Sequence, residues 1–296
     1  MSNRIYYAVQ KVGIGAAAGG SCSILRGVQS VSVGTTFSVE PIKSLGQISA
    51  YDSIENSHDV NVTIKRLLDG SPSIYSIIAA KAGASPSMED IAMAKCSVGI
   101  SIADDDGTTA LASMQCTDMY LSSFKYVFST EGNFEEEVSL IGDNKTWTGG
   151  AGNGFKSTNS PIIARRKDFL MGSSILPTSI PANSNIASIS ISVNINRENI
   201  AQFGSRTPFF RLPTFPIETV TEISVIAKEK DTVETKIDTP CGTIVDSTIA
   251  EKIYIAICEG TNIDLGINNK LVSTTYGGGD ATGGNVKINY TYKNWD

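Results

Sequence analysis

The sequence predicts a mainly β protein made of two tandem β-rich units of the sandwich or barrel type. Residues 28–39 (VQSVSVGTTFSV) and 186–196 (IASISISVNIN) alternate apolar residues with Ser, Thr, Gly or Asn, the period-2 pattern of a strand with one buried face. Charged residues make up only 18% of the chain, which favours β structure over charged helices. Short alternating stretches separated by Gly, Asn and Pro are typical of sandwiches and barrels.

The second observation behind two units is an internal repeat. Shifting the sequence by 158 residues places Val31 on Ile189 and Val33 on Ile191, with the apolar phase kept. Each stretch then leads through a loop into a second alternating segment, at residues 59–67 and 221–229. Later segments also recur in the same order, and each copy closes on one of the two tryptophans, Trp147 and Trp295. We therefore expect a first β domain over residues 1–150, a Gly/Ser/Asn connector over 151–163 and a second β domain over 164–296.

One flanking helix per unit is expected, and the first unit shows the clearer signals. Residues 73–82 have helical spacing and stop at Gly83. Residues 85–96 (SPSMEDIAMAKC) predict a second helix, because Ser87 as the N-cap and Asp90 three residues later resemble a capping box. The matching part of the second unit, residues 228–238, is too β-branched and charged to assign.

Composition limits the kind of partner. The formal charge is −6 over 296 residues, so the basic face needed to wrap nucleic acid is missing. No run approaches the ~20 apolar residues of a membrane helix, and the first residues lack a secretory signal. The five cysteines are widely spaced and odd in number, which predicts reduced thiols in a cytoplasm.

No catalytic, metal or cofactor site emerges. The single histidine, His58, is expected in a turn, and no cysteine or histidine spacing fits a metal. Residues 104–107 (DDDG) predict an acidic turn, and the glycine-rich residues 13–20 a flexible arm without a phosphate-loop context. The glutamates of residues 135–137 are expected at the exposed mouth of an edge strand. We predict a protein that is not an enzyme and binds no cofactor.

Residues 206–216 (RTPFFRLPTFP) predict a stiff extended loop, because three prolines exclude a central strand or helix. Arginine and aromatic side chains on a preorganised loop are typical of interface anchors. The loop could equally fold back over its own sheet, and we favour the interface. The predicted subunit or ring interface consists of Arg206, Phe209, Phe210, Arg211 and Phe215.

In order and patterning the chain resembles the phage tail tube proteins, above all in the long strand pair of residues 28–39 and 59–67 and in residues 120–144 (YLSSFKYVFSTEGNFEEEVSLIGDN). The resemblance implies tandem tail-tube-like domains whose strand pairs join into one oligomeric β-barrel. It also implies rings stacked into a hollow tube that conducts DNA from the capsid to the host. Because this chain carries two units, it resembles the members whose rings are trimers with pseudo-sixfold symmetry; a hexameric ring is the alternative.

The resemblance gives the small polar side chains a role. If they face a bore, short neutral groups keep water at the wall without binding phosphate, while Val31, Ile189 and their neighbours pack outward. The predicted lumen-lining residues are Ser30, Ser32, Thr36, Ser38, Asn61, Thr63, Ser188, Ser190, Ser192, Asn194, Asn196 and Ser224.

Implied partners are further copies of the chain, other tail proteins and DNA in transient, non-specific passage, without a membrane. The implied location is the virion tail, assembled in the host cytoplasm. Two alternatives stay open at this point. One is a distal tail or baseplate-hub ring of the same fold, and the other is a tandem β-sandwich that binds carbohydrate or a host surface.

Overall fold

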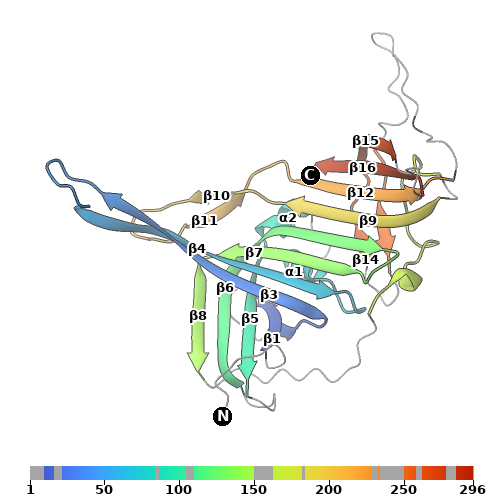
Figure 1. The fold of residues 1–296 in the computed structure, drawn as a ribbon. Coiled ribbons are helices and arrows are strands. Elements are labelled where there is room, and N and C mark those ends of the chain that lie inside the picture. Colours follow the sequence, from blue (N-terminus) through green and yellow to red (C-terminus); the bar gives the residue numbers. More distant parts are fainter. Residues whose placement is uncertain are drawn as a thin grey trace, which may run out of the picture.

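The computed structural model describes residues 10–16, 22–83, 87–104, 110–149, 163–181, 184–228, 233, 250–257, 262–277 and 285–295. The chain is mainly β, as predicted, and most strands belong to one large antiparallel sheet (Figure 1). The strands of the first half are β1 (Gln10–Ala16), β2 (Ser23–Ile24), β3 (Val28–Ile42), β4 (Asp52–Leu67), β5 (Lys95–Ala103), β6 (Ala110–Ser129), β7 (Glu135–Gly142) and β8 (Asn144–Gly149). Those of the second half are β9 (Asn185–Asn194), β10 (Arg197–Ile200), β11 (Phe210–Pro213), β12 (Glu218–Ile226), β13 (Tyr254–Ala256), β14 (Asn262–Asp264), β15 (Lys270–Gly277) and β16 (Lys287–Trp295).

Eight strands lie side by side in the order β3-β4-β7-β6-β9-β12-β16-β15. Both predicted long strand pairs are present, β3 with β4 and β9 with β12. The 20-residue strand β6 serves two groups of strands. Its second half pairs with β7 and β9, and its first half pairs with β5 and β8 in a part of the sheet that continues to β1 and β2.

The two halves of the eight-strand sheet share their order and their irregularities. The first four strands run β3-β4-β7-β6 and the last four run β9-β12-β16-β15. In pairing, β3 carries an extra residue at Gln29 and β9 one at Ala187, which are the positions that the 158-residue offset superimposes. Likewise β6 carries an extra residue at Ser122 and β15 one at Val272. A β-bulge is a specific local feature, so two matched bulges are strong evidence of equivalent strand positions.

Both predicted helices of the first half are present and lie behind the sheet in Figure 1. Helix α1 (Ile74–Ala82) begins after Ser73, whose hydroxyl accepts from the Ser76 amide, and ends before Gly83. Helix α2 (Met88–Met93) begins with the expected capping box of Ser87 and Asp90. In the second half the described residues contain only the 3₁₀ turn Arg166–Asp168 (η2), and most of residues 228–238 lie outside the described part.

One core underlies both halves. The apolar face of β9 is buried through Ile189, Ile191 and Val193, and these belong to the same cluster as Phe124 and Tyr126 of β6. Ala164 is hydrogen-bonded to both Leu68 and Phe134 of the first half, so the segment that opens the second half packs against the first. No helix of the described residues is long and apolar enough to cross a membrane.

Three local predictions were wrong. Gly13 lies in β1 rather than in a flexible arm; β1 approaches β2 so closely that a Cβ there would lie 2.9 Å from the Ser23 carbonyl oxygen. His58 lies within β4, not in a turn. Strand β7 is central, because it pairs with both β4 and β6, so Glu135 does not mark a sheet edge. Residues 17–20 and 105–107 lie outside the described residues.

Candidate assembly surface

The face of the eight-strand sheet opposite the core is polar along β3 and β9. Alternation and cross-strand pairing place most predicted lumen residues on it, because directly paired residues of antiparallel strands share a face. These are Ser30, Ser32, Thr36, Asn61, Thr63, Ser188, Ser190, Ser192, Asn194 and Ser224. Ser38 and Asn196 lie beyond the regular pairing, where β3 and β9 lead into two projecting arms.

The same face is not neutral throughout, which corrects the expectation drawn from β3 and β9. Lys65 of β4 forms an ion pair of 3.1 Å with Glu137 of β7, and Lys293 of β16 one of 2.8 Å with Glu218 of β12. Lys125 of β6 lies between Glu137 and Ser192 in the cross-strand register. The expectation missed these charges because it took only Asn61, Thr63 and Ser224 from the return strands, and placed neither Lys65 and Glu218 of those strands nor the charged residues of β6, β7 and β16 on this face.

The middle residue of the glutamate run 135–137, Glu136, points to the core side of the sheet and is a buried structural group. Glu136 is 0% exposed and forms an ion pair of 2.5 Å with Arg66. Its other oxygen accepts hydrogen bonds from the Tyr126 hydroxyl at 2.6 Å and from the Ile74 amide of α1 at 2.8 Å. Burial, followed by the neighbouring Glu136 carboxylate, raises the pKa of Tyr126 well above its ordinary value. Glu136 therefore faces the core, whereas Glu137 lies on the opposite face.

Inside the chain, β6 and β9 form a seam between the two halves. Seven residue pairs join them, from Ser123–Asn194 to Ser129–Ser188. On the core side of the seam Phe124 faces Val193 and Tyr126 faces Ile191, and all four side chains are at most 3% exposed. Hydrogen bonds continue beyond the paired strands, from the Ile195 amide to the Ser122 carbonyl at 2.7 Å. The two four-strand halves therefore form one continuous sheet.

The two ends of this sheet are unpaired among the described residues. Strand β3 pairs with β4 alone, and β15 pairs with β16 alone. Both edges carry exposed apolar side chains: Phe37 at β3 (67% exposed), and Val272 (51%) and Tyr276 (60%) at β15. A long apolar strand edge is a template for pairing with another chain.

Two arms project from the same end of the sheet (Figure 1). The first is the distal part of β3 and β4, and the second is the hairpin of β10 and β11. Each tip presents an apolar side chain followed by a glycine with positive φ: Leu45 with Gly46 (87°) and Phe203 with Gly204 (84°). Leu45 and Phe203 are fully exposed. The guanidinium of Arg206 lies 3.4 Å from the Glu55 carboxylate, so the arms lie side by side.

The predicted interface loop divides into inward and outward residues. Arg211 is 1% exposed and forms ion pairs with Asp59 at 2.6 Å and with Asp143. Phe210 packs edge-to-face on Tyr120. These two therefore stabilise the base of the arms, whereas Arg206, Phe209 and Phe215 remain exposed on the surface. The prolines are compatible with β11 because it belongs to a separate two-stranded hairpin.

Arg197 joins the second arm to the core and was not anticipated from the sequence. Its guanidinium donates to the carbonyl oxygens of Ala92, Leu121 and Arg211, and it lies over the Tyr120 ring at 4.8 Å. Burial lowers its pKa to about 10. An arginine at the start of a polar hairpin carries no sequence signal that would distinguish it from a surface residue.

The described residues hold no group of three or more His, Cys, Asp or Glu side chains suited to a metal. His58 contacts the ring of Phe37, 6.0 Å between centroids. Cys96 and Cys116 are free thiols, and burial raises the pKa of Cys96 to about 12 and of Cys116 to about 11, while the Cys22 sulfur lies 3.9 Å from the Ser97 hydroxyl oxygen. Cys241 and Cys258 lie outside the described residues.

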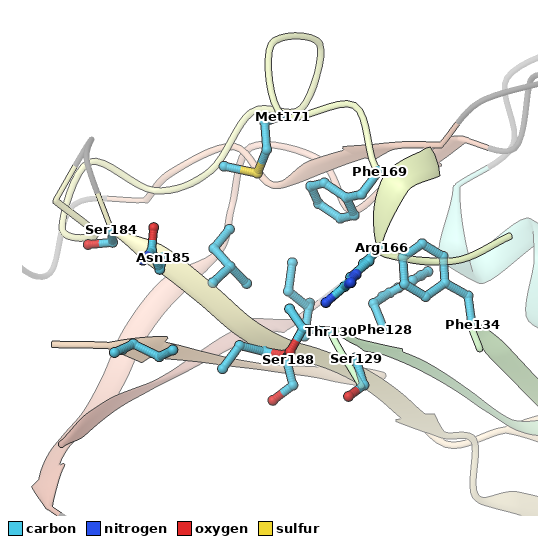
Figure 2. A pocket seen from close by; sticks show the side chains of 14 residues that line it. Phe128, Ser129, Thr130, Phe134, Arg166, Phe169, Met171, Ser184, Asn185 and Ser188 are labelled. Carbon is cyan, nitrogen blue, oxygen red and sulfur yellow. The ribbon is translucent and has the colours of Figure 1, made fainter. Parts of the chain in front are cut away.

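A cavity of about 440 Å³ lies at the end of the sheet opposite the arms. Its wall includes Phe128, Phe169, Met171 and Ile186, with Arg166 beside them, as Figure 2 shows for the labelled side chains. Because Ile186 lies at the start of β9 and the second arm follows the end of β9, the cavity and the arms are separated by the length of that strand. The lining is mainly apolar and offers no convergent set of polar groups for catalysis.

No family model and no curated protein sequence matches this chain. Among solved structures, it is similar to the tube-terminating cap of the anti-feeding prophage (14% identity, TM-score 0.39, covering 50% of this chain and 93% of that chain). It is also similar to the sheath/tube terminator of an extracellular contractile injection system called PVC (16% identity, TM-score 0.37, covering 50% and 98%). A third similarity is to a chain of the PVC sheath–tube complex in its extended state (14% identity, TM-score 0.39, covering 50% and 93%).

Proposed function

We propose that this chain is a structural, non-enzymatic subunit of a phage-type tail tube, and that its two halves are duplicated tube domains. The observation that carries the proposal is the β6–β9 seam. It joins two four-strand halves with the same order and the same two bulges, and it leaves one edge from each half unpaired. A sheet that repeats its own edge pairing closes into a ring by adding copies of itself.

Three copies are the preferred number. The eight strands of one chain form two four-strand halves, and each half would occupy one of six equivalent positions around the ring. Three chains would therefore complete a pseudo-sixfold barrel of twenty-four strands. Six copies would double the strand number, and barrel diameter grows roughly linearly with strand number. The hexameric alternative therefore predicts a bore about twice as wide.

The polar face would form the wall of the bore. Small hydroxyl and amide side chains hold water there, and the lysines Lys65 and Lys293 lie in ion pairs with carboxylates. Paired lysines bind phosphate less strongly than free ones, because the neighbouring carboxylate repels the DNA backbone. Such a wall lets DNA pass without retaining it.

Replacing Ser190 and Ser192 with Lys is expected to leave folding intact and to slow DNA ejection, most strongly at low salt; unchanged ejection would argue that this face is not the bore.

The arms would make contacts between stacked rings. Their exposed tips, Leu45 and Phe203, lie at one end of the sheet, so a head-to-tail stack would present them to the opposite end of the next ring. Arg206, Phe209 and Phe215 would belong to the same contact. Other tail proteins would cap the stack, and assembly would take place in the host cytoplasm before the tail joins the virion.

Electron microscopy of the purified protein, with native mass spectrometry, tests the proposal. The expected particles are rings of three 31.4-kDa chains that polymerise into hollow rods. Rings that never lengthen would indicate the distal or baseplate-hub alternative. A stable monomer at high concentration would overturn the proposal, and glycan binding by that monomer would support the carbohydrate-binding module instead.

A further inference from the structure

We infer the residue register in which neighbouring copies join: β15 of one chain pairs antiparallel with β3 of the next, with Ser273 opposite Thr36 and Tyr276 opposite Val33. The inference rests on the proposed ring. It specifies which backbone and side-chain groups meet at the subunit boundary.

The register follows from the matched bulges. Ser122 in β6 and Val272 in β15 are the extra residues of equivalent strands, so Ser123 corresponds to Ser273 and Tyr126 to Tyr276. Gln29 in β3 and Ala187 in β9 are the extra residues of the other equivalent pair. Ser32 therefore corresponds to Ser190.

Replacing each residue of the β6–β9 seam by its equivalent in β15 or β3 gives the residue pairs expected at the boundary between chains. The pair Ser123–Asn194 becomes Ser273–Thr36, and the pair Tyr126–Ile191 becomes Tyr276–Val33. A shift by one residue would turn every side chain of β15 to the wrong face. The internal seam thus fixes both the direction and the face of the proposed pairing.

The exposed apolar residues at the two free edges occupy the positions that this register would cover. Tyr126 and Ile195 are buried at the internal seam, and their equivalents Tyr276 and Phe37 are 60% and 67% exposed in the single chain. The hydrogen bond from the Ile195 amide to Ser122 would become one from Phe37 to Val272. A second copy of the chain is the occupant that supplies these partners on both edges at once.

A buried hydroxyl at the edge points to the same register. Thr274 Oγ1 is buried and has no hydrogen-bond partner in the described residues. In the proposed register Thr274 lies opposite Thr35 of the neighbour, since it corresponds to Phe124, which faces Val193. Threonine pairs across antiparallel strands form hydrogen bonds. At the internal seam the same positions hold an apolar pair, so the boundary between chains is the more polar of the two.

Paired cysteines test the register. In one chain β3 and β15 are the first and last of eight strands, about 34 Å apart along the sheet at ~4.8 Å per strand spacing, so a disulfide between them must join two chains. The Ser273→Cys, Thr36→Cys double variant is expected to give covalent trimers after mild oxidation, because facing residues lie within disulfide range. The Ser123→Cys, Asn194→Cys variant is the matched internal control and should close within one chain.

Further variants separate failure of the register from failure of the ring. Ser273→Cys with Ser32→Cys places the thiols four residues out of register, and the single variants report background from the native cysteines. Rings that link at Ser32 and not at Thr36 would overturn the register and leave the proposed function standing. If the internal control closes but no rings are seen by microscopy, the ring itself is wrong. If rings form and neither pair links, the β15–β3 boundary is wrong.

Discussion

The buried carboxylate of Glu136 provides the sharpest prediction about folding. The change is Glu136→Gln, which keeps the size of the side chain and removes its charge. In the native protein Glu136 receives hydrogen bonds from Arg66, Tyr126 and the amide of Ile74, and it is 0% exposed. The amide would leave the Arg66 guanidinium, itself 1% exposed, without a counter-charge.

The magnitude follows from that burial. Removing one partner of a buried ion pair typically costs about 3–5 kcal/mol, because the remaining charge stays desolvated. The adjacent Glu137 provides a matched control, since its ion pair with Lys65 is exposed to solvent (39% and 55% side-chain exposure). An exposed pair contributes about 0–1 kcal/mol, so Glu137→Gln should change the free energy of unfolding little.

Equilibrium urea unfolding, followed by tryptophan fluorescence, measures the difference. It should be run at protein concentrations where the midpoint no longer depends on concentration, so that assembly does not contribute. At a denaturant slope of about 2–3 kcal/mol/M, Glu136→Gln should lower the midpoint by about 1–2.5 M. The double change Arg66→Met, Glu136→Leu should recover only part of the loss, since apolar replacement of a buried pair is often neutral but here leaves the Tyr126 hydroxyl and the Ile74 amide without their acceptor.

One result would refute the reasoning: equal midpoints for Glu136→Gln and Glu137→Gln. It would mean that Glu136 is hydrated or that Arg66 finds another partner, and hence that the buried network does not fasten α1 to the sheet. A midpoint that falls equally for the double apolar variant would instead point to loss of packing or of the hydrogen bonds from Tyr126 and Ile74, rather than loss of the charge pair.

Three further outcomes are expected. Arg211→Met should destabilise the arms by about 3 kcal/mol, because Asp143, whose side chain is 14% exposed, loses its counter-charge; hydrogen exchange should accelerate in β10 and β11, and unchanged protection would contradict this role. Burial raises the pKa of Cys96 from 9.0 to about 12, so its stabilisation should be complete below pH 9 and disappear as pH rises to 12; the difference in the free energy of unfolding between the native protein and Cys96→Ala should therefore be constant below pH 9 and change only in that window. Phe203→Ser should leave rings intact and shorten rods; rods of normal length would exclude the tip from stacking.

Local signals in the sequence predicted the helices and the long strand pairs correctly. Ser73 and Gly83 bound α1, and Ser87 with Asp90 begins α2, because a cap depends on residues within one turn of the helix. Alternation likewise predicted β3 and β9, since a half-buried strand requires period 2 wherever it lies. The burial of Ile189 and Ile191 confirms the phase.

Features that depend on contacts between residues far apart in the sequence were missed or misassigned. The glutamate run was expected at the mouth of an edge strand; it does begin β7, but β7 is central and Glu136 is buried, because β4 lies beside β7 and Glu136 accepts a hydrogen bond from α1. Arg211 looked like an interface anchor, yet it is buried against Asp59, 152 residues away. The neutral wall inferred from β3 and β9 is interrupted by charges on β4, β7 and β16.

The sequence by itself determined that the chain is mainly β, which residues face the core along its long strands, and that two similar segments recur 158 residues apart. Only the tertiary structure decided that β6 and β9 join those segments into one sheet, and where its unpaired edges lie. Strand order is set by backbone hydrogen bonds, which are common to all residues except proline, together with the burial that each arrangement allows. A periodic pattern therefore specifies the face of a strand but not the strand beside it.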